Sequence, residues 1–173
     1  WTINAPNAGN INNSNGTSTY SNIENLIGGT NTDTFSFVGT GSIASIDGGT
    51  GSNTLDYSGY SNTITTTLTL GIPGTGFNGT SSGITNGFAN IDTLVGSGNN
   101  NDTLIGANLI NVWNITNSNT GIIQADNSPF LSSQFNFSNI ENLTGGTDND
   151  TFILSDGGSV TGTINGNGGM NTL

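Results

Sequence analysis

The chain has 173 residues, of which 11 are acidic and none is lysine, arginine, histidine or cysteine, so its formal net charge is −11 at pH 7. It therefore has no imidazole base, no thiol nucleophile, no amine for a Schiff base and no ordinary zinc ligand set. It cannot neutralise the phosphates of nucleic acid, and no stretch approaches the roughly 20 apolar residues of a membrane-spanning helix. The composition predicts a protein that is not an enzyme, that does not bind nucleic acid and that does not insert into a membrane.

Short stretches of alternating apolar and polar residues recur along the chain, separated by glycine and asparagine. In the longest stretch, residues 64–70, the side chains of Ile64, Thr66, Leu68 and Leu70 fall on one side of an expected strand. Asn-Gly pairs at 15–16, 78–79, 86–87 and 165–166 mark sharp turns, because both residues tolerate positive φ. No stretch has convincing helical periodicity, so we predict an all-β protein.

A large repeat organises these stretches. Five short segments of the first part of the chain recur, in the same order, in the last part. The segments are residues 1–3, 20–26, 28–30, 33–35 and 53–55, and they recur as residues 113–115, 137–143, 145–147, 150–152 and 171–173. The offset grows from 112 residues between Trp1 and Trp113 to 118 between Leu55 and Leu173, as insertions in turns would produce. We predict a first repeat unit over 1–112 and part of a second over 113–173, within one continuous array, and we expect that array to be longer than this chain.

A shorter period lies inside the unit. Glycine-rich corners at positions 28, 48, 96, 145 and 166 are 20, 48, 49 and 21 residues apart, which is near 20 or roughly twice that value. This spacing predicts a β-solenoid with coils of about 20 residues, stacked about eight deep. Two β-sandwich domains in tandem are the alternative, because the two long spacings and the run at 64–70 also fit that fold.

A stack of coils needs few apolar residues, because each coil is covered by the coils above and below it. The isoleucines, leucines and phenylalanines that recur at matched places are therefore the expected core. They are Ile23, Leu26, Phe35, Ile46, Leu55, Ile91, Leu94, Leu104, Ile140, Leu143 and Phe152.

Two corners, residues 28–36 (GGTNTDTFS) and 145–153 (GGTDNDTFI), resemble the nine-residue calcium repeat of RTX, or haemolysin-type, proteins, Gly-Gly-x-Gly-x-Asp-x-apolar-x. In that family six residues turn around a calcium ion and three form a short strand, which builds a right-handed parallel β-roll. The resemblance implies a right-handed parallel β-solenoid or β-roll-like stack here. By position it implies Asp33, Asp102 and Asp150 as calcium ligands, with Asp148 a further candidate.

The corners also depart from the family pattern. The fourth position, glycine in the family, is Asn31 in one corner and Asp148 in the other, and the ligand position is Asn53 or Asn171 elsewhere. The corners are also isolated, whereas family repeats follow one another every nine residues. Two interpretations therefore stay open: calcium sites, or Asn/Asp turns that need no ion.

The chain as a whole resembles the degenerate RTX-flanking repeats of very large bacterial surface and secreted proteins, which implies an extracellular or cell-surface location. We expect a structural repeat of a filament, sheath or adhesin stalk, whose open β edges pair end to end with identical or similar repeats. The alternative is an ice- or glycan-binding β-solenoid module with rows of threonine and asparagine. Asp148 and Asp150 are spaced like a glycosidase pair, but the basic residues usual in such sites are absent, so we predict no catalytic residues.

Overall fold

The computed structural model describes residues 1–71, 76–125 and 134–173. These residues form strands and no helix, so the predicted all-β class is confirmed. None of them belongs to a helix that could cross a membrane. The strands of the first unit are β1 (Thr2–Ala5), β2 (Ala8–Asn13), β3 (Gly16–Ser21), β4 (Asn25–Gly29), β5 (Thr34–Gly39), β6 (Ser45–Gly49), β7 (Thr54–Tyr60), β8 (Thr65–Thr69), β9 (Phe77–Ser81), β10 (Ile84–Ile91), β11 (Thr93–Val95) and β12 (Thr103–Ile105). Those of the second are β13 (Asn111–Asn117), β14 (Thr120–Ala125), β15 (Gln134–Ser138), β16 (Asn142–Thr144), β17 (Thr151–Leu154) and β18 (Ile164–Asn165).

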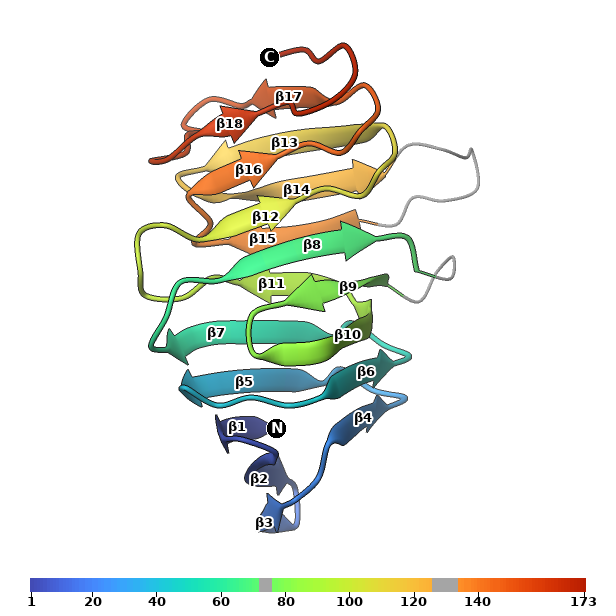
Figure 1. Cartoon of the computed structure of the whole chain (residues 1–173), viewed down its shortest axis with the longest axis vertical. Coiled ribbons are helices and arrows are strands. Elements are labelled where there is room, and N and C mark those ends of the chain that lie inside the picture. The colour runs from blue at the N-terminus through green and yellow to red at the C-terminus, as the bar shows by residue number, and fades with distance from the viewer. Residues whose placement is uncertain (72–75, 126–133) are drawn as a thin grey trace.

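The strands form two mixed sheets that run along the molecule (Figure 1). The larger sheet has the order β17-β13-β14-β15-β11-β7-β5-β1-β2-β3, and the smaller has the order β18-β16-β12-β8-β9-β10-β6-β4. From β4 to β7 the chain changes sheet at every strand, and it does so again from β10 to β13 and from β15 to β18. The result is an elongated stack with β3 and β4 at one end and β17 and β18 at the other.

Three antiparallel meanders interrupt the parallel pairing within the two sheets: β1-β2-β3, β8-β9-β10 and β13-β14-β15. The second meander lies between Gly48 and Gly96, and the third lies between Gly96 and Gly145. Their extra strands account for the two long glycine spacings. The sheets therefore contain both parallel and antiparallel strand pairs. In each meander the chain forms three consecutive antiparallel strands of one sheet before it crosses to the other sheet.

The core lies along the inside of the stack, where inward side chains of both sheets are buried. Ten of the eleven expected core residues are buried, from Leu26 to Phe152. Ile23 was the wrong prediction: it is 43% exposed, whereas its counterpart Ile140 is 0% exposed. The physical reason is position, because Ile23 lies at the end of the stack, beside β4, the last strand of its sheet.

The run at 64–70 forms β8 as expected, with Ile64, Thr66 and Leu68 buried. The buried Thr66 hydroxyl has a hydrogen-bond partner in the core, the Ser81 hydroxyl at 2.7 Å. Leu70 follows the strand and is exposed, so the predicted alternation of buried and exposed side chains ends at Leu68 rather than at Leu70.

The Asn-Gly predictions had different outcomes. Gly16 starts β3 directly after a turn, with φ of 126°. Asn165 is the last residue of β18 and Gly166 follows it without positive φ, so no sharp turn forms there. Residues 78–79 are not a turn but lie inside β9, where Gly79 packs so closely on the Phe88 ring that a Cβ would clash. Gly87 (φ of 90°) lies inside β10, where the register with β9 shifts. Gly79 therefore allows close packing, and Gly87 allows an irregularity in the strand pairing.

The sequence repeat has a structural counterpart. The meander β13-β14-β15 repeats β1-β2-β3, and β16, β17 and β18 take the places of β4, β5 and β6. Trp1 stacks on Phe35 at 6.1 Å between ring centroids, and Trp113 stacks on Phe152 at 5.4 Å. The same aromatic pair therefore joins adjacent strands of the larger sheet in both units.

Candidate functional site

The expected ligand residues lie at corners that precede strands. Asp33 comes directly before β5, Asp102 before β12 and Asp150 before β17. Asp102 and Asp150 are buried, Asp33 is half-buried and Asp148 is exposed. The structure thus separates the four residues, and only Asp148 and Asp150 belong to the same corner.

The buried carboxylates accept hydrogen bonds from N–H and O–H groups. Asp102 Oδ1 accepts from the Ile64 N–H at 2.8 Å and the Ser97 hydroxyl at 3.0 Å, and Oδ2 accepts from the Ser97 N–H at 2.5 Å. Asp150 Oδ1 accepts from the N–H and the side-chain amide of Asn111 at 2.8 and 2.7 Å. Its Oδ2 accepts from the Gly146 N–H at 2.7 Å. Each carboxylate closes its own turn and also joins it to a segment 38 or 39 residues away.

These contacts bear on the calcium prediction. Calcium is bound by six to eight oxygen ligands, whereas N–H donors face the oxygens of Asp102 and Asp150. Across the described ranges, no three acidic side chains converge on a point that could hold a metal ion. The observed contacts are those of turns that are satisfied without an ion, and calcium binding stays a prediction.

Similar contacts continue along the stack and form what we call the corner ladder. In each, a side-chain oxygen at one corner accepts the backbone N–H of the corner nearer the β3/β4 end. Four such hydrogen bonds run from the Asp33 N–H to Asn53 Oδ1 (3.0 Å), from the Asn53 N–H to Asp92 Oδ2 (2.7 Å), from the Asp102 N–H to Glu141 Oε2 (2.9 Å) and from the Asp150 N–H to Asn171 Oδ1 (2.8 Å). Because Asn and acids are both acceptors, this ladder explains why asparagine occupies positions that are aspartate in the RTX pattern.

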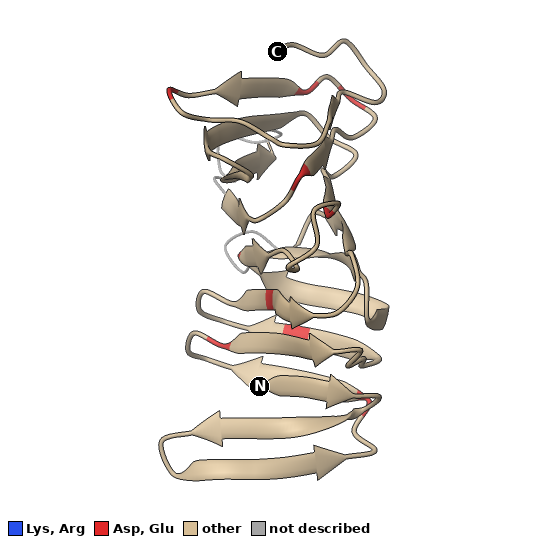
Figure 2. Cartoon of the chain, turned by 90° about the vertical axis from the view of Figure 1, so that its left-hand side faces the viewer, with Lys and Arg blue, Asp and Glu red and all other residues tan. Residues whose placement is uncertain are grey.

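Two ladder residues, Asp92 and Glu141, were not among the expected site residues. The signal for them was present, since an acid follows Asn-Ile at positions 24, 92 and 141. Burial raises the pKa of both carboxyls, and the nearby Asp102 adds a smaller upward effect on the pKa of Glu141. Acidic residues recur along the stack except on β2 and β3, and the chain has no lysine or arginine (Figure 2). No basic side chain therefore offsets the repulsion between the carboxylates.

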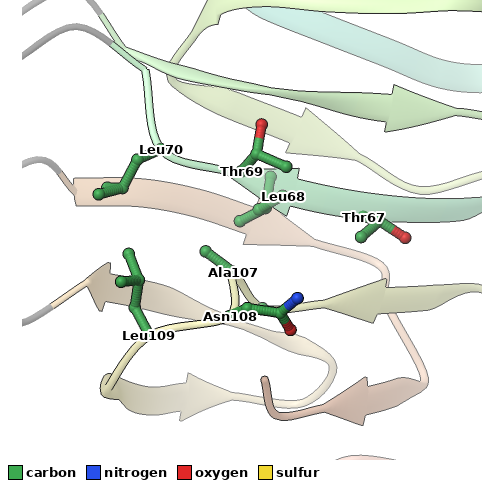
Figure 3. Close-up of a pocket in the computed structure, with 8 residues that line it drawn as sticks. Thr67, Leu68, Thr69, Leu70, Ala107, Asn108 and Leu109 are labelled. Atoms are coloured by element: carbon green, nitrogen blue, oxygen red, sulfur yellow. The ribbon is translucent and has the colours of Figure 1, made fainter. Parts of the chain in front are cut away.

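A shallow pocket of about 280 Å³ lies between β8 and the segment after β12. Its lining is largely apolar, with Leu68, Leu70, Ala107 and Leu109 around it (Figure 3). The polar lining groups are threonines and Asn108, and none of the lining side chains is charged. The pocket therefore has no group for acid–base chemistry.

The end of the stack nearest the N-terminus has a different character. We call it the N-terminal face and define it as the outer edges of β3 and β4 with residues 22–24 between them. β3 and β4 are the last strands of their sheets, so each has one edge that pairs with no described strand. Ile27, on β4, is 65% exposed. An open edge beside exposed isoleucines is a template for another strand.

The second unit shows the same surface in a covered state. Its counterparts of Tyr20, Ile23 and Glu24 are Phe137, Ile140 and Glu141, which are 2%, 0% and 2% exposed. In the first unit Ile23 and Glu24 are exposed and Tyr20 is half-buried. The difference arises because β11 and β12 cover β15 and β16.

No family model matches this chain, and neither a curated protein nor a solved structure matches it significantly.

Proposed function

We propose that the chain is a structural repeat of an extracellular filament, sheath or adhesin stalk, which continues end to end through open strand edges. One observation carries this proposal: Ile23 and Glu24 are exposed on the N-terminal face, whereas their counterparts Ile140 and Glu141 are buried inside the stack. Ile23 and Ile140 have identical neighbours in sequence, yet only Ile140 is covered. A surface that is buried wherever a preceding coil exists is suited to receiving one.

We further propose that the chain is coiled as a right-handed β-solenoid, into which the meanders are inserted. The alternation of strands between two sheets supports this arrangement, as does the continuity of both sheets past residue 112. Two separate sandwich domains would instead divide each sheet at the unit boundary. In a solenoid every coil depends mainly on its neighbours, so units can be added without redesigning the core.

The first repeat unit contributes the same number of strands to each sheet, which also supports a linear array. In the first unit the larger sheet gains six strands (β1, β2, β3, β5, β7 and β11), and the smaller sheet also gains six (β4, β6, β8, β9, β10 and β12). Because both sides advance by the same number of strands, repeated units need not accumulate strong curvature. With strands about 4.8 Å apart, six strands correspond to about 29 Å per unit.

The proposed partners are identical or similar repeats, and the proposed location is outside the cell. The location rests on the resemblance to repeats that flank RTX segments. Absence of lysine and arginine supports it as well, because trypsin-like proteases would find no cleavage site in the chain. Of the two interpretations of the corners, calcium sites at Asp33, Asp102, Asp148 and Asp150 or turns that need no ion, we propose the second, because N–H donors occupy the oxygens of Asp102 and Asp150.

The test is a series of proteins that carry one, two and four copies of residues 1–112 ahead of the full chain. Negative-stain microscopy is expected to show straight rods whose length rises by about 29 Å per added copy. Flexible beads on a string, or a length that does not scale with copy number, would contradict the proposal.

An ice- or glycan-binding face is a second candidate, favoured by one row of side chains. Thr34, Thr54 and Thr93 are direct neighbours across β5, β7 and β11. The row continues with Asn136 on β15 rather than a fourth threonine. Thermal hysteresis or glycan-array binding that is lost in Thr54→Tyr would support this function, and the absence of both would exclude it for this face.

A further inference from the structure

The covered edge of β15 shows how a strand adds to this type of meander. β11 pairs with it in parallel, with Thr93, Leu94 and Val95 opposite Asn136, Phe137 and Ser138. The Asn136 N–H donates to the Asp92 carbonyl at 2.8 Å, and the Gly96 N–H donates to the Ser138 carbonyl at 2.9 Å. Both groups on β15 point away from β14, which pairs with its other edge.

The covered edge of β16 gives the second half of the contact. β12 pairs with it in parallel, with Thr103, Leu104 and Ile105 opposite Asn142, Leu143 and Thr144. The Asn142 N–H donates to the Asp102 carbonyl at 2.9 Å. Glu141 completes this contact by accepting the Asp102 N–H, so Asp102 is held at both its backbone groups.

β3 and β4 have the same local geometry as β15 and β16. Tyr20 lies opposite Gly9 on β2, as Phe137 lies opposite Gly121 on β14. After each strand the chain turns through an asparagine in the left-handed region, with φ of 56° at Asn22 and 57° at Asn139. The backbone that receives β11 and β12 in the second unit is therefore already formed in the first.

Glu24 is also positioned as Glu141 is. One oxygen of Glu141 accepts the Asn119 amide at 3.0 Å, and the matching oxygen of Glu24 accepts the Asn7 amide at 3.4 Å. The other oxygen of Glu141 accepts the Asp102 N–H, whereas within residues 1–71, 76–125 and 134–173 no donor is found for the other oxygen of Glu24. Glu24 thus presents an acceptor toward the open end of the corner ladder.

We infer that the N-terminal face binds residues 91–105 of another copy of the repeat unit, with its 93–95 segment adding to Thr19–Ser21 of β3 and its 103–105 segment adding to Asn25–Ile27 of β4. In this register Glu24 accepts the backbone N–H of the incoming Asp102, and Ile23 becomes buried. The inference rests on the proposed end-to-end function and adds to it a partner segment, a register and an acceptor.

The position at which one repeat unit is joined to the next along the chain is consistent with this register. Within the chain, residue 112 is bonded directly to Trp113, the counterpart of Trp1. A copy of residues 1–112 joined to Trp1 by the same bond therefore places its β11 and β12 next to β3 and β4 without a new linker.

The test uses a tandem protein in which residues 1–112 are joined directly to Trp1 of the full chain, compared with the chain alone. Residue-resolved hydrogen exchange reports on the amides of Thr19, Ser21 and Asn25. We expect their exchange to slow by at least about tenfold in the tandem, toward the rates of Asn136, Ser138 and Asn142. Unchanged exchange at these three amides would overturn the inference.

A proline pair controls for register. Thr19→Pro in the second copy removes an N–H that the inferred strand needs, whereas Thr17→Pro removes an N–H two residues outside the register on the same edge. We expect Thr19→Pro to abolish the protection of Ser21 and Asn25, and Thr17→Pro to retain it. Both variants in the single chain are expected to unfold at nearly the same temperature as each other, because by correspondence with β15 neither N–H faces β2. Equal protection of Ser21 and Asn25 in the two tandem variants would overturn the register.

The same samples separate this inference from the proposed function. Rods of regular length with unprotected Thr19 and Ser21 would leave the end-to-end proposal standing and overturn the register. Protected amides in a tandem that forms no straight rods with further copies would support the register and contradict the filament.

Discussion

At the scale of single residues, one side chain often joins two corners that are far apart in the sequence. Glu141 accepts the Asp102 N–H at 2.9 Å and the Asn119 amide at 3.0 Å, and it is buried. Its loss would leave a buried N–H without a partner, which costs about 1–3 kcal/mol. The acceptor matters here more than the charge, since asparagine fills equivalent roles at Asn53 and Asn171.

The corresponding prediction compares two substitutions. Glu141→Ala is expected to lower the free energy of unfolding by about 1–3 kcal/mol, whereas Glu141→Gln, which keeps an acceptor oxygen, is expected to lower it by less than about 1 kcal/mol. Denaturant unfolding of both variants measures the difference. Equal loss in the two variants would show that the charge, rather than the acceptor, stabilises the corner.

The same residue predicts a dependence on pH. Burial raises the pKa of Asp92 and Glu141, so in the window above the ordinary carboxyl pKa of about 4 the folded chain binds more protons than the unfolded chain. The contribution of these groups to stability is therefore largest below this window and declines as pH rises through it. Asp102 is the acidic neighbour of Glu141, and its charge acts in the same direction.

We expect the midpoint of thermal unfolding to fall as pH is raised from about 4 to about 7. The dependence should be weaker in Glu141→Gln, which cannot titrate at that position. A midpoint that rises over this range would contradict the raised pKa of the Asp92 and Glu141 carboxyls.

At the scale of elements, the corners set how closely successive strands can approach. Gly96, between β11 and β12, packs so closely that a Cβ would meet the Asn139 carbonyl and the Asp102 carboxylate. Gly98, two residues later in the same corner, has open space around the equivalent position. One glycine is therefore required for packing, and the other is not.

This contrast gives a matched pair of variants. Gly96→Ala is expected to destabilise the fold by about 1–3 kcal/mol, because a tightly packed corner must shift to admit the methyl group. Gly98→Ala is expected to change stability by less than about 0.5 kcal/mol. Unfolding midpoints of the two proteins check the expectation, and similar midpoints would contradict the packing at this corner.

At the scale of the whole molecule, the stack has no ion pairs between side chains to hold it together, since the chain has no basic side chain. Its strands are joined by backbone pairing, the corner ladder and stacked rings such as Trp113 on Phe152. These interactions run along the axis, so the ends of the stack are where they stop. A strand pair added at an end would extend all three at once.

A calcium titration is the remaining prediction at this scale. Because N–H donors already face the oxygens of Asp102 and Asp150, we expect the thermal midpoint to be the same in a calcium chelator and in millimolar calcium. Magnesium at the same concentration controls for screening of the net charge of −11. A calcium-specific rise of several degrees would instead support the ligand roles implied by the RTX resemblance.

The sequence alone determined the all-β class, the repeat and nearly all of the core, because strand periodicity and turn residues act over a few neighbouring positions. It also determined which chemistries are absent, since side chains that do not occur cannot react. Only the tertiary structure decided that the long glycine spacings hold meanders, that Gly79 packs instead of turning, and that Ile23 is exposed. It also decided which N–H meets which side-chain acceptor, because these partners lie 20 to 39 residues apart and meet only when the strands of each sheet pair.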